Sequence, residues 1–545
     1  MTMRRAQKST RRPVRRGIVL IIVLVLVAMV ALAGFGFLAD MTTEYEATKI
    51  ENDRVQATQV MASAETLIVL LAGQQRQPAD GLFEQRSAFF SEHEKYQGRI
   101  LERARPDGQQ LPTVSQEAAE DLAIQDSRWR FSILTRLPQP VSQADLILAG
   151  DGGDEYAEPL QYGLQNESGK LNLWQVREME RAVYGSGYRA LMALPGMTTP
   201  IADAILDWCD DNDQPRNHGV EKEHYEQLKP PIHPRNDIPQ SIEELLFVHE
   251  VTRELFYGLK QEQRDSVEEG TPTAWADLLT VHSAERNVDP WGQRRRNLND
   301  GGHDRLAELE QHLSGFVSQE LASFIALART FGLTHYDPSD KVISLSELSQ
   351  ADVPEPGPHL HHIHSLADLI DARVPLGLPE DFANSRRTVV ESPLRSDNID
   401  TLRQFEDLEQ RVTTRWDEVL RGGVNINDAP EPVLRAVIGD PGITARIIQE
   451  RETVPEHERQ SVLWLLRRRV MDGHRFRSIY RHITTGGDVY TGHIIVYRRT
   501  GGPFRIRKVT VDAANLPARR VDWVDLTEQG LPVSLIDLEQ RMERR

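Results

Sequence analysis

The feature that most constrains this chain is an uncharged apolar stretch near its start. Residues 17–39 carry no charged side chain, and seven Lys or Arg but no acid come before them. A helix needs roughly 20 apolar residues to cross the hydrocarbon core of a bilayer. The stretch therefore predicts a membrane-spanning helix at 18–39. Because basic flanks stay in the cytoplasm, the bulk of the chain is expected on the far side.

A secretory signal peptide is also basic and then apolar, but its apolar core spans only about 7–15 residues before a small-residue cleavage site. Here the apolar run is longer, and Ala39-Asp40 makes a poor cleavage site. From this stretch alone, a plain signal anchor is the alternative interpretation. Neither Gly nor Pro occurs between Gly36 and Gly73. The helix is therefore predicted to continue to Ala72 as a rod of roughly 80 Å.

Length and net charge limit the number of domains and the classes of partner that the rest of the chain can have. The 545 residues are enough for two or three domains. The net charge is −18, and loss of a leader with seven basic residues would leave about −25. Such an acidic exported body argues against nucleic acid as a partner, because affinity for nucleic acid comes mainly from neutralising phosphates. The single cysteine, Cys209, cannot form an intrachain disulfide, and we expect it to be buried beside Trp208.

Strand patterns occur on both sides of a long helical middle. Residues 129–134 alternate between apolar and polar side chains, which is typical of a strand. Residues 488–497, 504–512 and 519–526 predict an antiparallel meander packed on one face of the rod. Residues 162–173 have turn-forming residues at their centre and predict a hairpin.

An asparagine-centred pattern occurs three times, at 170–173, 296–300 and 423–430. We expect each Asn to cap or staple the preceding segment through side-chain hydrogen bonds. A helical stretch is predicted at 306–329, after the middle copy. After the first and third copies, Thr198 and Thr444 follow a Pro-Gly-apolar triplet and are predicted helix N-caps. The first of these helices has one apolar face, formed by Ile201, Ala204, Ile205 and Trp208.

These two units resemble helix-hairpin-helix modules, which often bind DNA backbones. Thr198 and Thr444 stand where the DNA-binding hairpin has a second Gly. Acidic residues crowd the first unit. The second unit is more basic and keeps DNA binding open; its arginines are Arg446, Arg451, Arg459 and 467–469.

The densest acid cluster follows the first of these helices, and it offers several oxygen ligands within about 15 residues. Calcium takes six to eight oxygen ligands, but this loop lacks the Gly of an EF-hand. A solvated acidic loop is the alternative to a calcium site. The candidate ligands are Asp207, Asp210, Asp211, Asp213 and Glu221. The four histidines at 359–364 lie in a proline-rich stretch without Cys or nearby acids, so we expect a solvated loop there rather than a zinc site.

Residues 152–156, Gly-Gly-Asp-Glu-Tyr, resemble the signature pentapeptide of diguanylate cyclases. The strand-helix setting of that signature is absent, and GTP is not available across the membrane. Asp151 and Asp154 would instead suit a nearby cation. Neither a nucleophile elbow nor a phosphate loop nor an acid/base pair is recognisable. We therefore expect no enzymatic activity.

The basic leader, Gly17 and the apolar helix that turns amphipathic resemble the type IV prepilin class, which includes the pseudopilins of type II secretion. The resemblance implies that a prepilin peptidase cuts after Gly17 and methylates the new amino terminus, Ile18. Most members carry Glu at the fifth mature position, where this chain has Ile22. The K-type minor pseudopilin typically lacks that Glu.

With the Asn repeats and the C-terminal strands, the chain resembles the K-type minor pseudopilin (GspK-like) over nearly its whole length. The specific parts are 166–173, 204–210 with Glu221 and Tyr225, and 424–430. Departures are Trp174, where the family often repeats Asn, and an extra segment at about 255–400.

The resemblance implies an α+β fold in which the long pilin helix packs on a C-terminal antiparallel sheet, with a large helical insertion. The implied division is a leader at 1–17, the membrane helix at 18–39, the first part of the head at 40–149, the insertion at 150–475 and the C-terminal strands at 476–545. Within the insertion, the first helix-hairpin-helix-like unit is 150–255, the extra segment 256–400 and the second unit 401–475.

The same resemblance implies the function. The chain would be a single-pass inner-membrane protein with a cytoplasmic N-terminus and a periplasmic bulk. It would sit with other minor pseudopilins at the tip of a short filament, in contact with secreted cargo, and a missing Glu fits a subunit with nothing above it. The resemblance also favours calcium at the acid cluster. A membrane-anchored DNA-binding protein for DNA uptake and a type IV pilus minor pilin are the alternatives.

Overall fold

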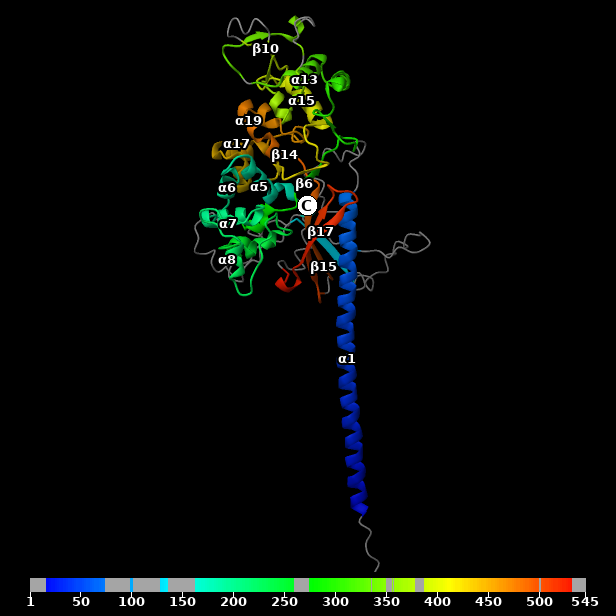
Figure 1. The fold of residues 1–545 in the computed structure, drawn as a ribbon. Coiled ribbons are helices and arrows are strands. Elements are labelled where there is room, and N and C mark those ends of the chain that lie inside the picture. Colours follow the sequence, from blue (N-terminus) through cyan, green and yellow to red (C-terminus); the bar gives the residue numbers. More distant parts are fainter. Residues whose placement is uncertain are drawn as a thin grey trace, which may run out of the picture.

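The computed structural model describes ten stretches of the chain and shows two bodies carried by one long helix (Figure 1). The described residues are 16–73, 99–100, 128–135, 162–258, 274–334, 336–348, 355, 357–377, 387–498 and 501–531. One body is an antiparallel sheet that lies against the helix. The other is a larger helical body, joined to the sheet at two crossing points.

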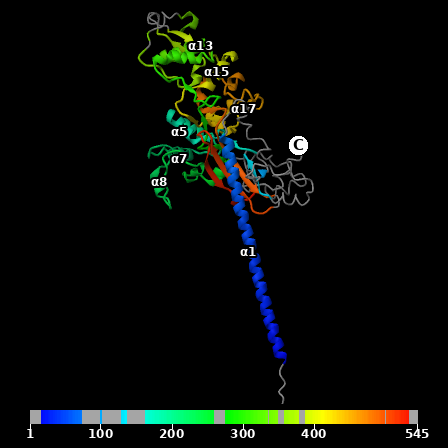
Figure 2. The ribbon, with the colours of Figure 1, turned by 90° about the vertical axis from the view of Figure 1, so that its right-hand side faces the viewer.

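The long helix, α1, spans Arg16–Gly73 without a break, as the absence of internal helix breakers predicts. It contains the one segment of the described residues, Leu20–Gly73, that is long and apolar enough to cross a membrane. The side chains from Leu20 to Leu38 are exposed in the isolated chain. The apolar half of α1 stands clear of both bodies (Figure 2). This arrangement fits a single-pass anchor whose other half carries the head.

The sheet is antiparallel and has the order β1-β2-β15-β16-β17, with β3 as a second, short partner of β15. Its strands are β1 Arg99–Ile100, β2 Arg130–Leu134, β3 Gln165–Asn166, β15 Val489–Tyr497, β16 Arg505–Asp512 and β17 Arg519–Asp525. The predicted strand at 129–134 and the predicted C-terminal meander are confirmed.

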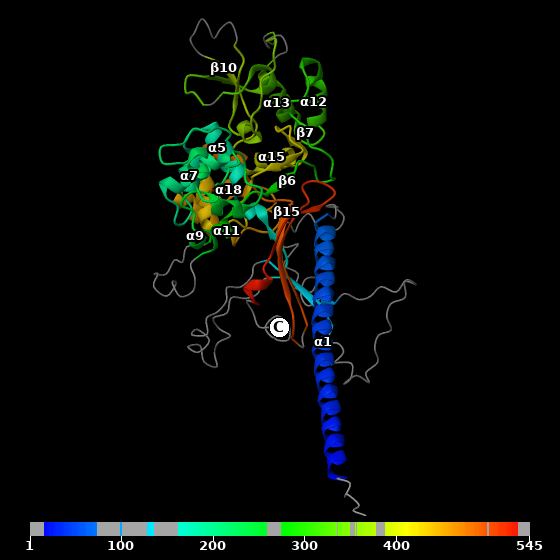
Figure 3. The same cartoon turned by 60° about the horizontal axis from the view of Figure 1, so that its bottom comes forward.

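The second half of α1 packs on this sheet, as predicted. Ala57, Met61, Ala64 and Ile68 recur at helical spacing and are fully buried in one core with sheet residues such as Ile495. Small alanines alternate with larger side chains, so the helix can approach the strands closely. Figure 3 shows the sheet between α1 and the helical body.

The chain leaves the sheet after β3 and returns to it at β15, and the helical body lies between. Three short parallel strand pairs divide this body into three modules. They are β4 Leu171–Asn172 with β5 Leu279–Thr280, β7 Arg296–Asn297 with β11 Val412–Thr413, and β13 Val424–Asn425 with β14 Ile483–Thr484. Each module opens with a strand that ends in Asn and closes with a strand that ends in Thr. We refer to these pairs as the first, second and third clasps.

The side chains of the three clasps repeat the same hydrogen bonds. The Oδ1 atoms of Asn172, Asn297 and Asn425 each accept from the backbone N–H two residues on, at 2.8, 2.8 and 3.0 Å. The Oγ1 atoms of the opposing threonines accept in the same way, from His282 at 3.1 Å, Arg415 at 3.1 Å and Gly486 at 3.2 Å. The repeated Asn residues do form side-chain hydrogen bonds, but these bonds hold the segment that follows each Asn and not the preceding segment that the sequence predicts.

The modules share one apolar core in which Trp275, Phe324, Phe405 and Trp464 are fully buried. The first module holds α5 Leu173–Ala182, α6 Ser186–Leu191, α7 Thr199–Cys209, α8 Lys222–Glu226, α9 Arg253–Tyr257 and α11 Trp275–Leu278. The second holds α12 Leu306–Leu313, α13 Gln319–Phe331, α15 Ile399–Arg411 and the strands β8 Lys341–Ile343, β9 Arg373–Pro375 and β10 Thr388–Glu391. The third holds α16 Glu431–Ile438, α17 Pro441–Arg451, α18 Trp464–Arg467 and α19 Gly473–Ile479. The finer limits predicted within 150–475 stay predictions.

The predicted hairpin at 162–173 is wrong. β3 pairs with β15, whereas β4 pairs with β5, so the two strands belong to different parts of the molecule. Between them Glu167–Gly169 forms a 3-10 turn, in which the side chain of Asn166 accepts from the backbone of Ser168 at 2.9 Å. The turn-forming residues thus build the crossing from the sheet to the helical body.

Two predicted helix limits also need correction. The stretch at 306–329 is two helices, because Ser318 caps a new helix by accepting from the backbone N–H of Leu321 at 3.2 Å. Thr444 lies inside α17, whose N-cap is Asp440, accepting from Ile443 at 2.9 Å. Thr198 does occupy the N-cap position of α7, although its side chain makes no capping bond.

Candidate metal centre

Helix α7 places two carboxylates on one of its faces and a third just past its end. Asp203 and Asp207 are one turn apart, and Asp210 follows the last helical residue. The apolar face predicted from the sequence is buried in the core of the body, with Trp208 only 2% exposed. Cys209 is also 2% exposed, as expected, and burial raises the pKa of its thiol to about 12. The packing of these apolar residues fixes the orientation of the acidic face.

Glu221 is brought to this face by the helix that follows it. It immediately precedes α8, and Tyr225 on that helix is 1% exposed and packs edge-on against Trp208, with ring centroids 5.1 Å apart. Because Tyr225 fastens α8 to α7, the chain between the helices must fold back over the acidic face. This packing explains why Glu221 and Tyr225 belong to the same sequence pattern.

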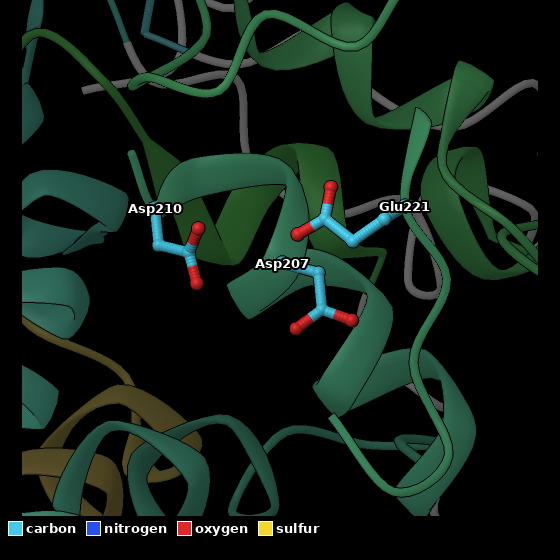
Figure 4. Close-up of side chains that lie close together, drawn as sticks. All are labelled: Asp207, Asp210 and Glu221. Carbon is cyan, nitrogen blue, oxygen red and sulfur yellow. The ribbon is translucent and has the colours of Figure 1, made fainter. Parts of the chain in front are cut away.

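The structure brings together three of the five predicted ligands. Asp207, Asp210 and Glu221 each offer a carboxylate oxygen, and these oxygens lie within 4.8 Å of one another (Figure 4). Asp207 is fully buried and Glu221 is 5% exposed. Neither oxygen of Glu221 makes a well-formed hydrogen bond among the described residues. A buried carboxylate without hydrogen bonds is costly, so this arrangement requires compensation.

The electrostatics of the cluster point the same way. Burial raises the pKa of Glu221 to about 8, and the neighbouring Asp207, Asp210 and Asp213 add to the rise. Burial likewise raises the pKa of Asp207 to about 7, although Arg216 opposes the rise. The guanidinium of Arg216 lies 3.6 Å from Asp207 but is shared with Glu180, 3.0 Å away. A divalent cation would remove the mutual repulsion that one shared arginine leaves.

The backbone between α7 and α8 is shaped around these carboxylates. The backbone N–H of Arg216 donates to Asp207 at 3.1 Å, and that of His218 donates to Asp203 at 3.3 Å. A Cβ atom on Gly219 would lie 1.9 Å from the Oδ2 atom of Asp207, so a larger residue here would displace that carboxylate. The loop therefore encloses the carboxylates at van der Waals distance.

The remaining predicted ligands are directed elsewhere. Asp211 is paired with Arg181 at 2.9 Å, and Asp213 accepts from the side chain of Asn236 at 2.7 Å. Both are exposed. The sequence analysis did not single out Asp203 or Gly219. The spacing of Asp203 one turn before Asp207 was a signal for the former, but nothing local marks Gly219.

The donor set fits calcium better than a softer metal, because it consists of carboxylate oxygens without Cys or His. Asp207, Asp210 and Glu221 would hold the ion.

The histidines at 359, 361, 362 and 364 are all exposed. Asp151 and residues 152–156 lie outside the described residues. Gly17 and Ile18 lie in the first turn of α1, and cleavage between them stays a prediction.

Residues 169–261 match the family model described as "Type II secretion system (T2SS), protein K". This part of the chain is GspK-like. The match supports the resemblance to a type II secretion pseudopilin that the sequence indicated. The matched segment runs from the crossing at Gly169 through α9 and includes the whole acidic cluster.

Two further comparisons add little. No curated protein matches the chain. Among solved structures, the GspK-GspI-GspJ complex from the enterotoxigenic Escherichia coli type 2 secretion system is similar at 8% identity and a TM-score of 0.34. That similarity covers 88% of this chain and 98% of the other. It is too low to support residue-level conclusions, which depend instead on the structure of this chain.

Proposed function

We propose that this GspK-like chain occupies the tip of the type II secretion pseudopilus, where it limits growth of the filament. Mature subunits would be released from the leader by prepilin peptidase between Gly17 and Ile18. Residues 18–39 would cross the inner membrane once, with the N-terminus in the cytoplasm and the bulk in the periplasm. Other minor pseudopilins, of the kinds in the GspK-GspI-GspJ complex, would contact the exposed face of α1.

The observation that carries this proposal is the position of the helical body relative to α1. Much of the body, including α13, α15 and β10, lies past the C-terminal end of α1, while α7 and α8 lie level with its upper part; all of it is away from the membrane-spanning half in both perpendicular views (Figures 1 and 2). A subunit stacked above along the same axis would need the space that the body fills. Ile22, in place of an assembly Glu, is consistent with a subunit that has no neighbour above it.

The body also offers a surface for secreted cargo, since it would be the outermost part of the filament. DNA uptake is not favoured. Helices α16 and α17 do form a helical hairpin, but the carboxylate of Asp440 caps the N-terminus of α17 where a phosphate would bind. A phosphate there would meet a negative charge rather than free N–H groups.

Labelling this chain in overproduced pseudopili tests the tip position. An epitope placed after residue 531 and detected with gold conjugates should mark filament ends and not filament sides. A labelled major pseudopilin in the same preparation is the control and should mark the sides. Gold distributed along the filaments for this chain would contradict the proposal.

We further propose that the acidic cluster binds calcium and that the ion holds α7 and α8 together. The two unpartnered oxygens of buried Glu221 support this proposal, because an ion would supply the missing interaction. Calcium would be structural here, linking the loop between the helices to the core of the first module. Its removal is expected to loosen the first module rather than to unfold the sheet.

A further inference from the structure

A second polar site lies where the second and third clasps meet. The strands β6 Ala284–Arg286 and β12 Val419–Arg421 pair antiparallel and connect the modules. Beside them is a cavity of about 160 Å³, lined from the second clasp by Thr413 and from the third by Thr484. We call it the hub cavity, because residues of the second and third clasps and Ser168 of the crossing from the sheet line it. Other lining residues belong to β6, α15 and β14, which are labelled in Figure 1.

Four arginines line the hub cavity: Arg295, Arg415, Arg421 and Arg481. Arg295 precedes the second module, Arg415 follows the second clasp and Arg481 precedes the third. Among the described residues, the guanidinium groups of Arg415 and Arg481 have no hydrogen bond or ion pair. Arg295 donates only to the backbone oxygen of Gln410, at 3.3 Å. The cavity wall therefore carries four cationic groups but only two carboxylates, those of Glu285 and Glu409.

Two carboxylates also line the cavity, those of Glu285 and Glu409, and both accept from neutral hydroxyl groups. Glu285 accepts from the hydroxyl of Thr484 at 2.8 Å. Glu409 accepts from the hydroxyl of Ser461 at 2.6 Å and from that of Tyr480 at 3.1 Å. Burial raises its pKa, which weakens it further as a counter-charge. Nearby, burial followed by the charges of Arg481 and Arg415 lowers the pKa of His482 to about 4. The region is therefore positive in the absence of a ligand.

We infer that the hub cavity binds a small oxyanion, a carboxylate or phosphate group, held by Arg415 with Arg295 and Arg481. Guanidinium groups present paired N–H donors that match the two oxygens of a carboxylate or phosphate. A cavity of this size accepts a group as large as a benzene ring, so either group fits. Its open side would admit the end of a longer molecule.

Such a ligand would join two modules of the body. The backbone N–H of Arg415 donates to Thr413 of the second clasp at 3.1 Å, while Arg481 lies two residues before the third clasp. An oxyanion between them would couple the two clasps through one charge. Its source would be either a free anion or a carboxylate of a bound peptide, and the chemistry of recognition is the same.

Calorimetric titration of the full chain in detergent micelles tests the inference. Sulfate serves as a calcium-compatible stand-in for phosphate, and an acetylated tripeptide with a free carboxyl terminus represents a peptide end. Arg415→Gln should weaken binding of the preferred probe at least tenfold, whereas Arg415→Lys should retain part of the affinity. Arg403→Gln is the matched control, because Arg403 is exposed on α15 and lies outside the cavity.

The two sources are separated by the probes. Tighter binding of sulfate indicates a free anion. Tighter binding of the tripeptide, lost when its carboxyl terminus is amidated, indicates a peptide end. Arg481→Gln provides a second variant if Arg415→Gln does not fold. Absence of heat for both probes with the wild-type chain, or equal binding by wild type and the folded variant, would overturn the inference.

Discussion

Asp53 of α1 accepts from both terminal nitrogens of Arg498, at 3.0 and 2.6 Å, although the two residues are 445 positions apart in the sequence. The same guanidinium lies over the ring of Trp129, 4.7 Å from its centroid. About three helical turns further along α1, Glu65 accepts from Arg507 and from Arg520, each at 2.5 Å. The membrane helix and the last strands are therefore one mechanical unit, so a force on the anchor reaches the sheet directly.

Breaking this pair should destabilise the head. Arg498→Gln leaves the largely buried Asp53 without its bidentate partner, and we expect a loss of about 2 kcal/mol in the free energy of unfolding. Chemical denaturation followed by the circular dichroism of the sheet measures the loss. The control is Arg54→Gln, since Arg54 and Glu51 form an exposed pair on the same helix that should contribute under about 1 kcal/mol. Equal effects of both substitutions would argue against a structural role for the pair.

Processing at Gly17 is tested by the mass of the mature chain. We expect a methylated Ile18 at the amino terminus, because the leader, Gly17 and the apolar helix are arranged as in prepilins. Gly17→Asp should leave the unprocessed precursor in the membrane fraction. An intact Met1 in the wild-type chain, or a cut near Ala39, would mean that the stretch is a signal anchor or a signal peptide instead.

Calcium should stabilise the wild-type chain against heat, and a chelator should remove that stabilisation. At a free calcium concentration 100 times the dissociation constant, linkage predicts a gain of about 2.7 kcal/mol. Glu221→Gln removes a buried ligand and should abolish the calcium-dependent part of the melting temperature. Asp213→Asn, which alters an exposed side chain bonded to Asn236, should keep it. A calcium response that survives Glu221→Gln would place the ion elsewhere.

His493 of β15 should make the head sensitive to acid. Burial and the nearby Lys508 and Lys170 lower its pKa from 6.5 to about 3, so it stays neutral in the folded sheet while the unfolded chain binds a proton. Its contribution to stability is therefore complete above pH 6.5 and is lost as the pH falls toward 3.

Over that interval the unfolding free energy of wild type should fall more steeply than that of His493→Gln, by up to about 1.4 kcal/mol per pH unit. Denaturation curves at several pH values compare the two slopes. Parallel slopes would show that the imidazole is protonated in the folded state. Because other acidic groups titrate in both proteins, only the difference between the slopes is informative.

The clasps should contribute more to stability than ordinary caps. Asn425 is 1% exposed, accepts from the backbone of Asn427 at 3.0 Å and donates to Asp428 at 2.8 Å. Asn425→Ala should cost about 2 kcal/mol, because it leaves buried polar groups unpaired. Asn398→Ala removes the same type of bond, to Asp400 at 3.1 Å, from an exposed helix start and should cost about 1 kcal/mol or less.

Hydrogen exchange separates the two roles of Asn425. Amides of α16 and of β14, which closes the third module, should lose protection in Asn425→Ala, whereas α5 in the first module should not. Uniform loss of protection would indicate that the modules unfold as one unit and that the clasps do not act separately.

Features that depend on neighbouring residues followed from the sequence. The absence of Gly and Pro between Gly36 and Gly73 predicted the unbroken part of α1. The strands β15 to β17 showed a repeat of two residues, and the apolar face of α7 showed a repeat of 3.6 residues. The Asn side chains of the clasps accept hydrogen bonds from the backbone two residues further along, so their bonding depends only on neighbouring residues. The hairpin at 162–173 was wrong because turn residues show that the chain bends without showing which strand it meets next.

Only the tertiary structure decided which distant segments meet. Asn172 lies opposite Thr280. Glu221 reaches Asp207 because Tyr225 packs on Trp208. The arginines of the hub cavity come from segments that are far apart in the sequence. The physical reason is that local patterns arise from backbone geometry and side-chain periodicity. Convergence of charges, by contrast, results from how the apolar core of the whole body packs, and many arrangements of the same helices would leave these residues apart.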